Sequence, residues 1–144
     1  MLLDELTHFT LSLLAGGYVA ILFGNAWAIP VALLSGFFID TDHFFDYLLF
    51  KKFRNLSLRE FYPCEFFNIW AKVILPFHGF EYVLIMFVIA FYIPEYQWWL
   101  FALSGSLLLH LIYDTISNKP YWPTYFITFR IMKRFRHSEF RFKQ

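Results

Sequence analysis

Residues 6–23 read LTHFTLSLLAGGYVAILF, a stretch with no Lys, Arg, Asp or Glu and with a single histidine. A helix that crosses a lipid bilayer needs about 20 mostly apolar residues. A membrane strand would instead alternate polar and apolar residues, and this stretch does not alternate. The stretch therefore predicts a membrane-spanning helix.

Further apolar stretches follow along the chain. We expect spans at about 6–23, 27–50, 77–93 and 96–117. Two shorter stretches, 65–75 and 121–137, mix apolar and polar residues and are expected to lie at the membrane surface. The predicted fold is all-α: one membrane domain over residues 1–144, built as an integral bundle of about four transmembrane helices plus interfacial helices.

The composition supports this assignment. Hydrophobic residues make up 59% of the chain, aromatic residues 24%, and the mean hydropathy is +0.50. Soluble domains have about 45–50% apolar residues, and a small domain could not bury this excess. The lone Cys64 excludes an internal disulfide and a cysteine-rich metal site. The net charge of +1 by itself says nothing about partners, and the sequence gives no expectation of a nucleic-acid partner.

The basic residues predict the orientation. All 12 Lys and Arg lie in the 51–76 linker, at Lys119, or in the tail from Arg130 onward. The loops near residues 24–26 and 94–97 contain none. By the positive-inside rule, both termini and the linker face the cytoplasm. We therefore expect a multi-pass membrane protein with both termini in the cytoplasm.

Ionisable residues recur inside the predicted spans. Placing such a residue at the centre of a membrane helix costs roughly 2.5–3.5 kcal/mol. Several of them in one chain therefore require an explanation. At 1.5 Å of rise per residue, all of them fall within about 15 Å of the cytoplasmic end of their helices. The set consists of His8, Asp40, Asp42, His43, Asp46, His78, Glu81, His110 and Asp114.

The spacing of these residues predicts a metal centre. The pairs Asp42/Asp46 and His110/Asp114 are four residues apart, and Asp40/His43 and His78/Glu81 are three apart, so each pair shares a helix face. Helix bundles build metal centres from such pairs. Imidazole and carboxylate ligands suit Zn, with Mn or Fe as alternatives, and one or two ions. The expected ligands are His8, Asp40, Asp42, His43, His78, Glu81, His110 and Asp114, and Glu81 or Asp42 is the expected general base.

Three motifs resemble a known family. They are Leu6-Thr7-His8, Gly36-Phe37-Phe38-Ile39-Asp40-Thr41-Asp42-His43 and His110-Leu111-Ile112-Tyr113-Asp114-Thr115. Together they resemble the bacterial membrane-bound metal-dependent hydrolases, which are similar in motif order to zinc-dependent phospholipase C and its related single-strand nucleases. The resemblance covers roughly residues 6–117. It implies a multi-helix protein of the bacterial inner membrane with hydrolase activity and with ligands at His8, Asp40, Asp42, His78, His110 and Asp114.

The third motif departs from that family. Its pattern is typically His-Arg-Gly-x-Thr-His-Ser, whereas this chain reads His78-Gly79-Phe80-Glu81-Tyr82. The Arg and the second His are missing. Two interpretations stay open: Glu81 replaces the lost ligand, or the chemistry has changed.

Three functions fit the pattern. The first is a metal-dependent hydrolase that acts on a phosphoester or lipid-like, amphiphilic substrate at the cytoplasmic face, with membrane lipids as its surroundings. The second is a metal or proton transporter, since intramembrane acids and histidines also form ion pathways. The third is a non-catalytic membrane protein with a structural metal site.

Overall fold

The computed structural model describes residues 2–61 and 66–140. These parts are largely helical and contain no β-strand, apart from one isolated bridge between Lys72 and Arg136. The all-α prediction is confirmed. Cys64 and the first residue of the expected 65–75 segment lie outside the described residues.

Eight α-helices and four short 3₁₀ turns make up the described parts of the chain. In chain order they are α1 (Leu2–Phe23), α2 (Ala28–Gly36), η1 (Phe38–Asp40), α3 (Thr41–Lys51), α4 (Leu58–Phe61), α5 (Phe66–Trp70), α6 (Phe80–Tyr92), η2 (Pro94–Tyr96), α7 (Gln97–Ser117), η3 (Trp122–Tyr125), α8 (Ile127–Met132) and η4 (His137–Phe140).

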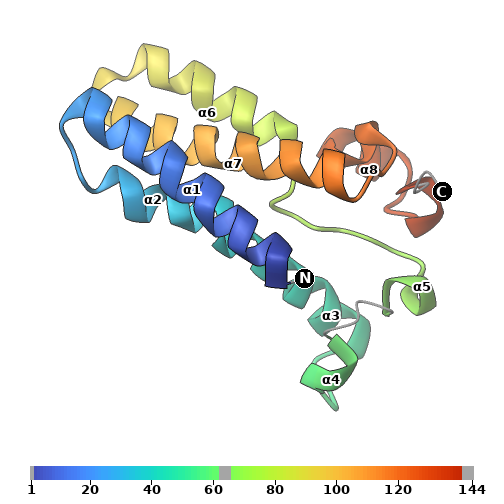
Figure 1. Ribbon diagram of the computed structural model, residues 1–144. Coiled ribbons are helices and arrows are strands. Elements are labelled where there is room, and N and C mark those ends of the chain that lie inside the picture. Colours follow the sequence, from blue (N-terminus) through green and yellow to red (C-terminus); the bar gives the residue numbers. More distant parts are fainter. Residues whose placement is uncertain (1, 62–65, 141–144) are drawn as a thin grey trace.

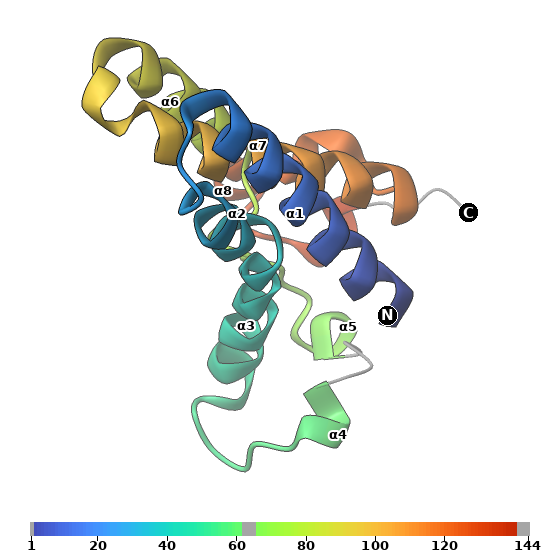
Figure 2. The same ribbon diagram turned by 60° about the vertical axis from the view of Figure 1, so that its left-hand side comes forward.

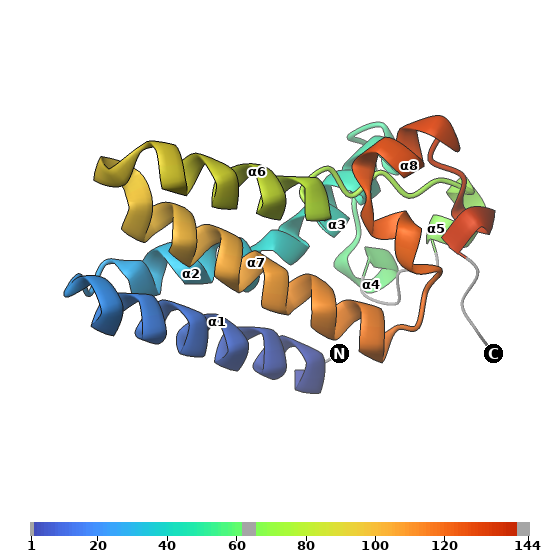
Figure 3. The same ribbon diagram turned by 90° about the horizontal axis from the view of Figure 1, so that it is seen from above.

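Helix α7 is the centre of the bundle. It packs against α1, α2 and α6, and α1 also packs against α2 (Figure 1). Seen from above, these four helices run alongside one another, and α3, α5 and α8 extend beyond one end (Figure 3). The N-terminus of α1 and the end of α7 lie at that same end, so the ionisable residues of both helices meet there.

Three helical segments are long and apolar enough to cross a membrane: Leu3–Phe23, Ala28–Lys51 and Pro94–Ser117. The expected third span is shorter than predicted, because α6 has 13 residues and therefore measures about 20 Å, against about 30 Å of hydrocarbon. Large apolar side chains stay exposed on the bundle; Ile21 is 87% and Tyr92 is 81% exposed. Such surfaces suit lipid, and the chain has the features of a membrane protein.

The second predicted span is not one continuous helix. A 3₁₀ turn at Phe38–Asp40 separates α2 from α3, and α3 turns away from the bundle below this point (Figure 2). Short 3₁₀ pieces within helices often mark functional positions. Here the turn carries Asp40.

Glycines let α2 lie close to its neighbours. A Cβ on Gly16 would come within 2.7 Å of the Ile29 backbone. A Cβ on Gly36 would overlap the hydroxyls of Ser12 and Ser106. Only a residue without a side chain fits at the end of α2, between α1 and α7.

The two segments expected at the interface are more irregular than predicted. The first contains the five-residue helix α5 and then a non-helical stretch up to Gly79. The second is divided into η3, α8 and η4 rather than forming one amphipathic helix. The tail folds back against the rest of the chain: Tyr125 and Phe140 belong to two separate buried clusters.

Candidate metal centre

Four ionisable side chains from separate elements meet at one end of the bundle. Asp40 ends η1, His78 precedes α6, and His110 and Asp114 share one face of α7. One ligand atom from each lies within 4.8 Å of the others, and the group could hold a metal ion. His78, His110 and Asp114 are buried, and Asp40 is partly exposed.

The separations between these atoms suit a small divalent ion. His78 Nε2 lies 3.2 Å and His110 Nε2 lies 3.4 Å from Asp40 Oδ1. Asp114 Oδ2 is 3.4 Å from His110 Nε2 and 3.8 Å from His78 Nε2. Ligands about 2.0–2.1 Å from a tetrahedral ion are separated by about 3.3 Å. The group therefore has the dimensions of a first coordination sphere.

The Nδ1 atoms of His78 and His110 each face a hydrogen-bond acceptor outside the four-residue group. His110 Nδ1 donates to the carbonyl oxygen of Gly36 over 2.7 Å, and His78 Nδ1 donates to Asp42 Oδ2 over 2.9 Å. A neutral imidazole protonated at Nδ1 carries its lone pair on Nε2. In the neutral form of both rings, the two Nε2 atoms would therefore direct their lone pairs toward each other, 3.1 Å apart, and toward two carboxylates. A bound cation would relieve this repulsion.

His8 lies on the other side of the same two carboxylates. Its Nε2 is 3.3 Å from Asp114 Oδ1 and 3.9 Å from Asp40 Oδ2, and its ring stacks on His110 with centroids 3.9 Å apart. Asp40 and Asp114 therefore each turn one oxygen toward the four-residue group and the other toward His8. This arrangement is compatible with one ion or with two ions bridged by carboxylates.

Asp42 orients the His78 side chain and is not a member of the four-residue group. Its Oδ2 accepts the Nδ1 proton of His78 and, over 3.1 Å, the backbone N–H of Phe77. Carboxylates that orient a ligating histidine in this way are common in metal proteins. Asp42, His43 and His78 also form a second possible metal-binding group, but there His78 would have to use the nitrogen that is bonded to Asp42.

His43 borders the centre without entering it. Its Nε2 is 3.8 Å from Asp40 Oδ1, and its ring meets that of His78 edge to face, with centroids 5.4 Å apart. Its Nδ1 has no hydrogen-bond partner among the described residues. His43 also lines a pocket that is bordered by Asp40.

Glu81, predicted as a ligand and base, is engaged elsewhere. Its carboxylate accepts hydrogen bonds from the backbone N–H groups of Ile127 and Thr128 at 3.0 and 2.9 Å, and from the Thr128 hydroxyl at 2.7 Å. These groups form the first turn of α8, where unpaired N–H groups favour an anion. The structure therefore does not bring Glu81 to the metal-binding group.

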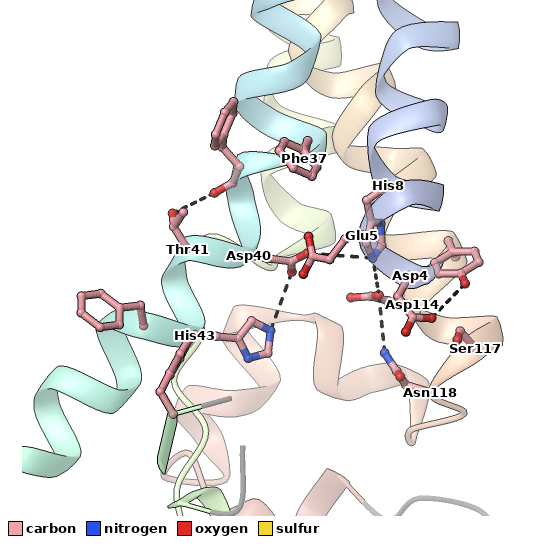
Figure 4. Close-up of a pocket in the computed structure, with 14 residues that line it drawn as sticks. Asp4, Glu5, His8, Phe37, Asp40, Thr41, His43, Asp114, Ser117 and Asn118 are labelled. Atoms are coloured by element: carbon pink, nitrogen blue, oxygen red, sulfur yellow. Dashed lines mark hydrogen bonds and ion pairs between the residues drawn. The ribbon is translucent and has the colours of Figure 1, made fainter. Parts of the chain in front are cut away.

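A pocket of about 520 Å³ opens beside Asp40, Asp114 and His8 (Figure 4). Its lining combines phenylalanines with acidic side chains, including Asp4 and Glu5. The described lining contains no Lys or Arg. The aromatic residues that line it are Phe37, Phe38, Phe44, Phe61 and Tyr113.

One buried cation is not evident from the sequence. The sequence places Arg130 in a surface-lying tail, yet it is only 2% exposed. Burial lowers the pKa of its guanidinium, while Asp42, Glu81 and Asp46 act in the opposite direction. No local signal separates Arg130 from exposed neighbours such as Arg134, because its burial depends on how the tail folds back.

Comparisons with known proteins add no family to this description. The chain matches no family model, no curated protein and no solved structure.

Proposed function

We propose that this protein is a membrane-embedded, metal-dependent hydrolase that acts on a phosphoester or lipid-like substrate at the cytoplasmic face of the bacterial inner membrane. The observation that carries the proposal is the pair of facing Nε2 atoms on His78 and His110, 3.1 Å apart between two carboxylates. The resemblance of the motifs around His8, Asp40 and His110 to membrane-bound metal-dependent hydrolases supports it.

Asp40, His78, His110 and Asp114 would hold the ion, and His8 would complete the centre or hold a second ion. Nitrogen and oxygen ligands in this number favour zinc, with manganese or iron as alternatives. A divalent ion in such a site supplies Lewis-acid activation of water and of the bond that is cleaved.

The pocket supports catalysis rather than a purely structural metal site. Structural zinc sites are closed by their protein ligands, whereas catalytic sites keep one side open. Here the pocket reaches Asp40, Asp114 and His8 from outside. The phenylalanines in its lining suit the apolar part of an amphiphile, and the acidic side chains with the ion suit the polar part.

We assign proton transfer to two side chains at the edge of the pocket. Glu5 and His43 line it beside the metal-binding group without belonging to the central four residues. We assign them to general acid–base catalysis in place of Asp42 and Glu81. Both carboxylate oxygens of Glu81 accept hydrogen bonds from α8. Asp42 Oδ2 accepts two N–H groups, and its Oδ1 is buried away from the pocket.

The position of the centre favours a hydrolase over a transporter. Transporters bind their ions near the middle of the bilayer, whereas these ligands cluster at the end of the bundle from which α3 and α8 extend. The linker and the tail, which carry the basic residues, lie at the same end, so we place it in the cytoplasm.

The test is a metal and activity assay on the purified full chain in lipid nanodiscs. We expect zinc at one or two equivalents and cleavage of a phosphoester-containing lipid, both lost in a His110→Ala/Asp114→Ala variant. Glu95→Gln, at the opposite end of the bundle, is the matched control and should behave as wild type. Equal residual hydrolysis in wild type and in the double variant would refute catalysis, and wild-type protein without bound zinc, manganese or iron would refute the metal centre.

A further inference from the structure

His78 reaches the candidate metal centre from a loop, not from a helix. No helix is assigned between Trp70 and Phe80, and this stretch crosses beneath the end of α7 on its way from α5 to α6 (Figure 1). His78 is nevertheless fully buried. Loops are the mobile parts of most proteins, so a ligand on this loop needs other groups to hold it.

Carboxylates of α3 bind the N–H groups of this loop. Asp46 Oδ2 accepts hydrogen bonds from the backbone N–H groups of Ile74 and Leu75 at 2.8 and 3.2 Å. Asp42 Oδ2 accepts the N–H of Phe77 as well as the imidazole N–H. One turn of α3 thus fixes one side of the loop.

Arg130 of α8 binds the carbonyl groups of the same loop. Its Nη1 donates to the carbonyl oxygens of Ile74 and Leu75 at 2.6 and 2.8 Å. Its Nη2 donates to the carbonyl oxygen of His78 itself. Together, α3 binds N–H groups of the loop and α8 binds its carbonyl groups.

The guanidinium is suited to this task. It presents several N–H donors in a fixed planar fork, whereas a lysine ammonium is a compact point charge on a flexible stem. Among the residues that the structure describes, Arg130 is the one Lys or Arg that is buried. Asp42 and Asp46 lie close enough to favour its charged form. A buried charge that makes this many bonds to one loop fixes the position of that loop.

We propose that Arg130 is a positioning residue of the metal centre: by binding the carbonyl groups of residues 74, 75 and 78, it holds the His78 imidazole with Nε2 toward Asp40, His110 and Asp114. The proposal rests on the metal site of the proposed function. It also connects the C-terminal segment to the metal centre. Helix α8 carries the guanidinium of Arg130, and its first N–H groups donate to the carboxylate of Glu81.

The test is a double-mutant cycle on zinc affinity, measured by chelator competition with full-length protein in nanodiscs. Arg130→Gln should weaken zinc binding about 10–100-fold, the usual effect of removing a group that supports a ligand. Arg130→Lys, which keeps the charge and loses the fork, should fall between wild type and Arg130→Gln. In a His78→Ala background, Arg130→Gln should cause no further loss, because its effect passes through His78. Arg134→Gln, at an exposed arginine of the same segment, is the matched control.

Hydrogen exchange provides the second measurement. The amides of residues 74, 75, 77 and 78 should exchange faster in Arg130→Lys, while those of α7 should not change. Zinc binding of wild-type strength in folded Arg130→Gln and Arg130→Lys, or full additivity with His78→Ala, would overturn the proposal while leaving the metal site intact. Wild-type protein that binds no zinc would overturn the metal site itself, and Arg130 would then be a structural residue of the loop.

Discussion

His78 and His110 face each other with Nε2 atoms 3.1 Å apart, and the other nitrogen of each ring is already bonded to an acceptor. Gly36 supplies one acceptor through its carbonyl group, and Asp42 supplies the other through its carboxylate. With each Nδ1 donating, the neutral form of either ring carries its lone pair on Nε2, and the two Nε2 atoms face one point. Such preorganisation of both imidazoles favours a bound cation between them.

Asp42→Asn should weaken metal binding without abolishing it. The residue holds His78 and does not itself reach the four-residue group, so we expect a loss of about 10–100-fold in zinc affinity with unchanged stoichiometry. Chelator competition measures the affinity, and elemental analysis measures the stoichiometry. A complete loss of zinc would instead indicate that Asp42 is a ligand.

Glu81→Ala should affect stability and not metal content. The carboxylate accepts the N–H groups that open α8, and the loss of such an interaction costs about 0.5–2 kcal/mol. We expect a lower melting temperature, faster hydrogen exchange in residues 127–132, and normal zinc stoichiometry. Loss of zinc at an unchanged melting temperature would show that Glu81 is a ligand after all.

Gly36→Ala should disturb both packing and the metal centre. The new Cβ would overlap the hydroxyls of Ser12 and Ser106, and relief of that overlap would move the carbonyl group that orients His110. Overpacking of this kind costs about 1–3 kcal/mol. We expect a lower melting temperature together with weaker zinc binding.

Gly17→Ala is the matched control for that substitution. A Cβ on Gly17 meets no heavy atom within 4 Å, and alanine is favoured over glycine in a helix by about 0.5–1 kcal/mol. Its melting temperature should equal or exceed that of wild type. If both alanine variants behave alike, close packing at Gly36 does not position His110.

His43→Gln should lower the rate of hydrolysis while the protein keeps its zinc. Loss of a general acid–base group costs about 10²–10⁴-fold in kcat and removes one limb of the pH–rate profile. His137→Gln, which changes a histidine outside the pocket, should retain full activity. An unchanged kcat and pH profile in His43→Gln would leave Glu5 as the remaining group for proton transfer.

The sequence predicted the helical membrane fold, because long apolar stretches have few alternatives to helices in lipid. It also predicted, from helix rise, that His8, Asp40, His78, His110 and Asp114 would lie at one depth. His78, however, reaches the group from a loop and not from a helix. Helix lengths were less predictable. The span at residues 27–50 is interrupted at Phe38–Asp40, and α6 is shorter than expected.

The roles of Asp42, Glu81 and Arg130 could not be deduced from spacing. Each depends on where a non-helical segment folds back: the loop to His78 brings backbone N–H groups to Asp42, and the tail brings α8 to Glu81. Arg130 lies in a basic run that is typical of a membrane surface, and only the folded tail shows that it is buried. Residues that act through backbone groups leave no spacing pattern in the sequence.

The most direct test of a metal held between His78 and His110 is X-ray absorption spectroscopy at the zinc edge, on zinc-loaded wild type and on His110→Ala. For wild type we predict a first shell of nitrogen and oxygen at about 2.0–2.1 Å without sulfur, with outer-shell scattering from at least two imidazoles. In His110→Ala the outer-shell scattering should correspond to one imidazole fewer than in wild type, and zinc should bind more weakly. An identical spectrum in both proteins, or the absence of imidazole scattering in wild type, would contradict a metal centre built on these two histidines.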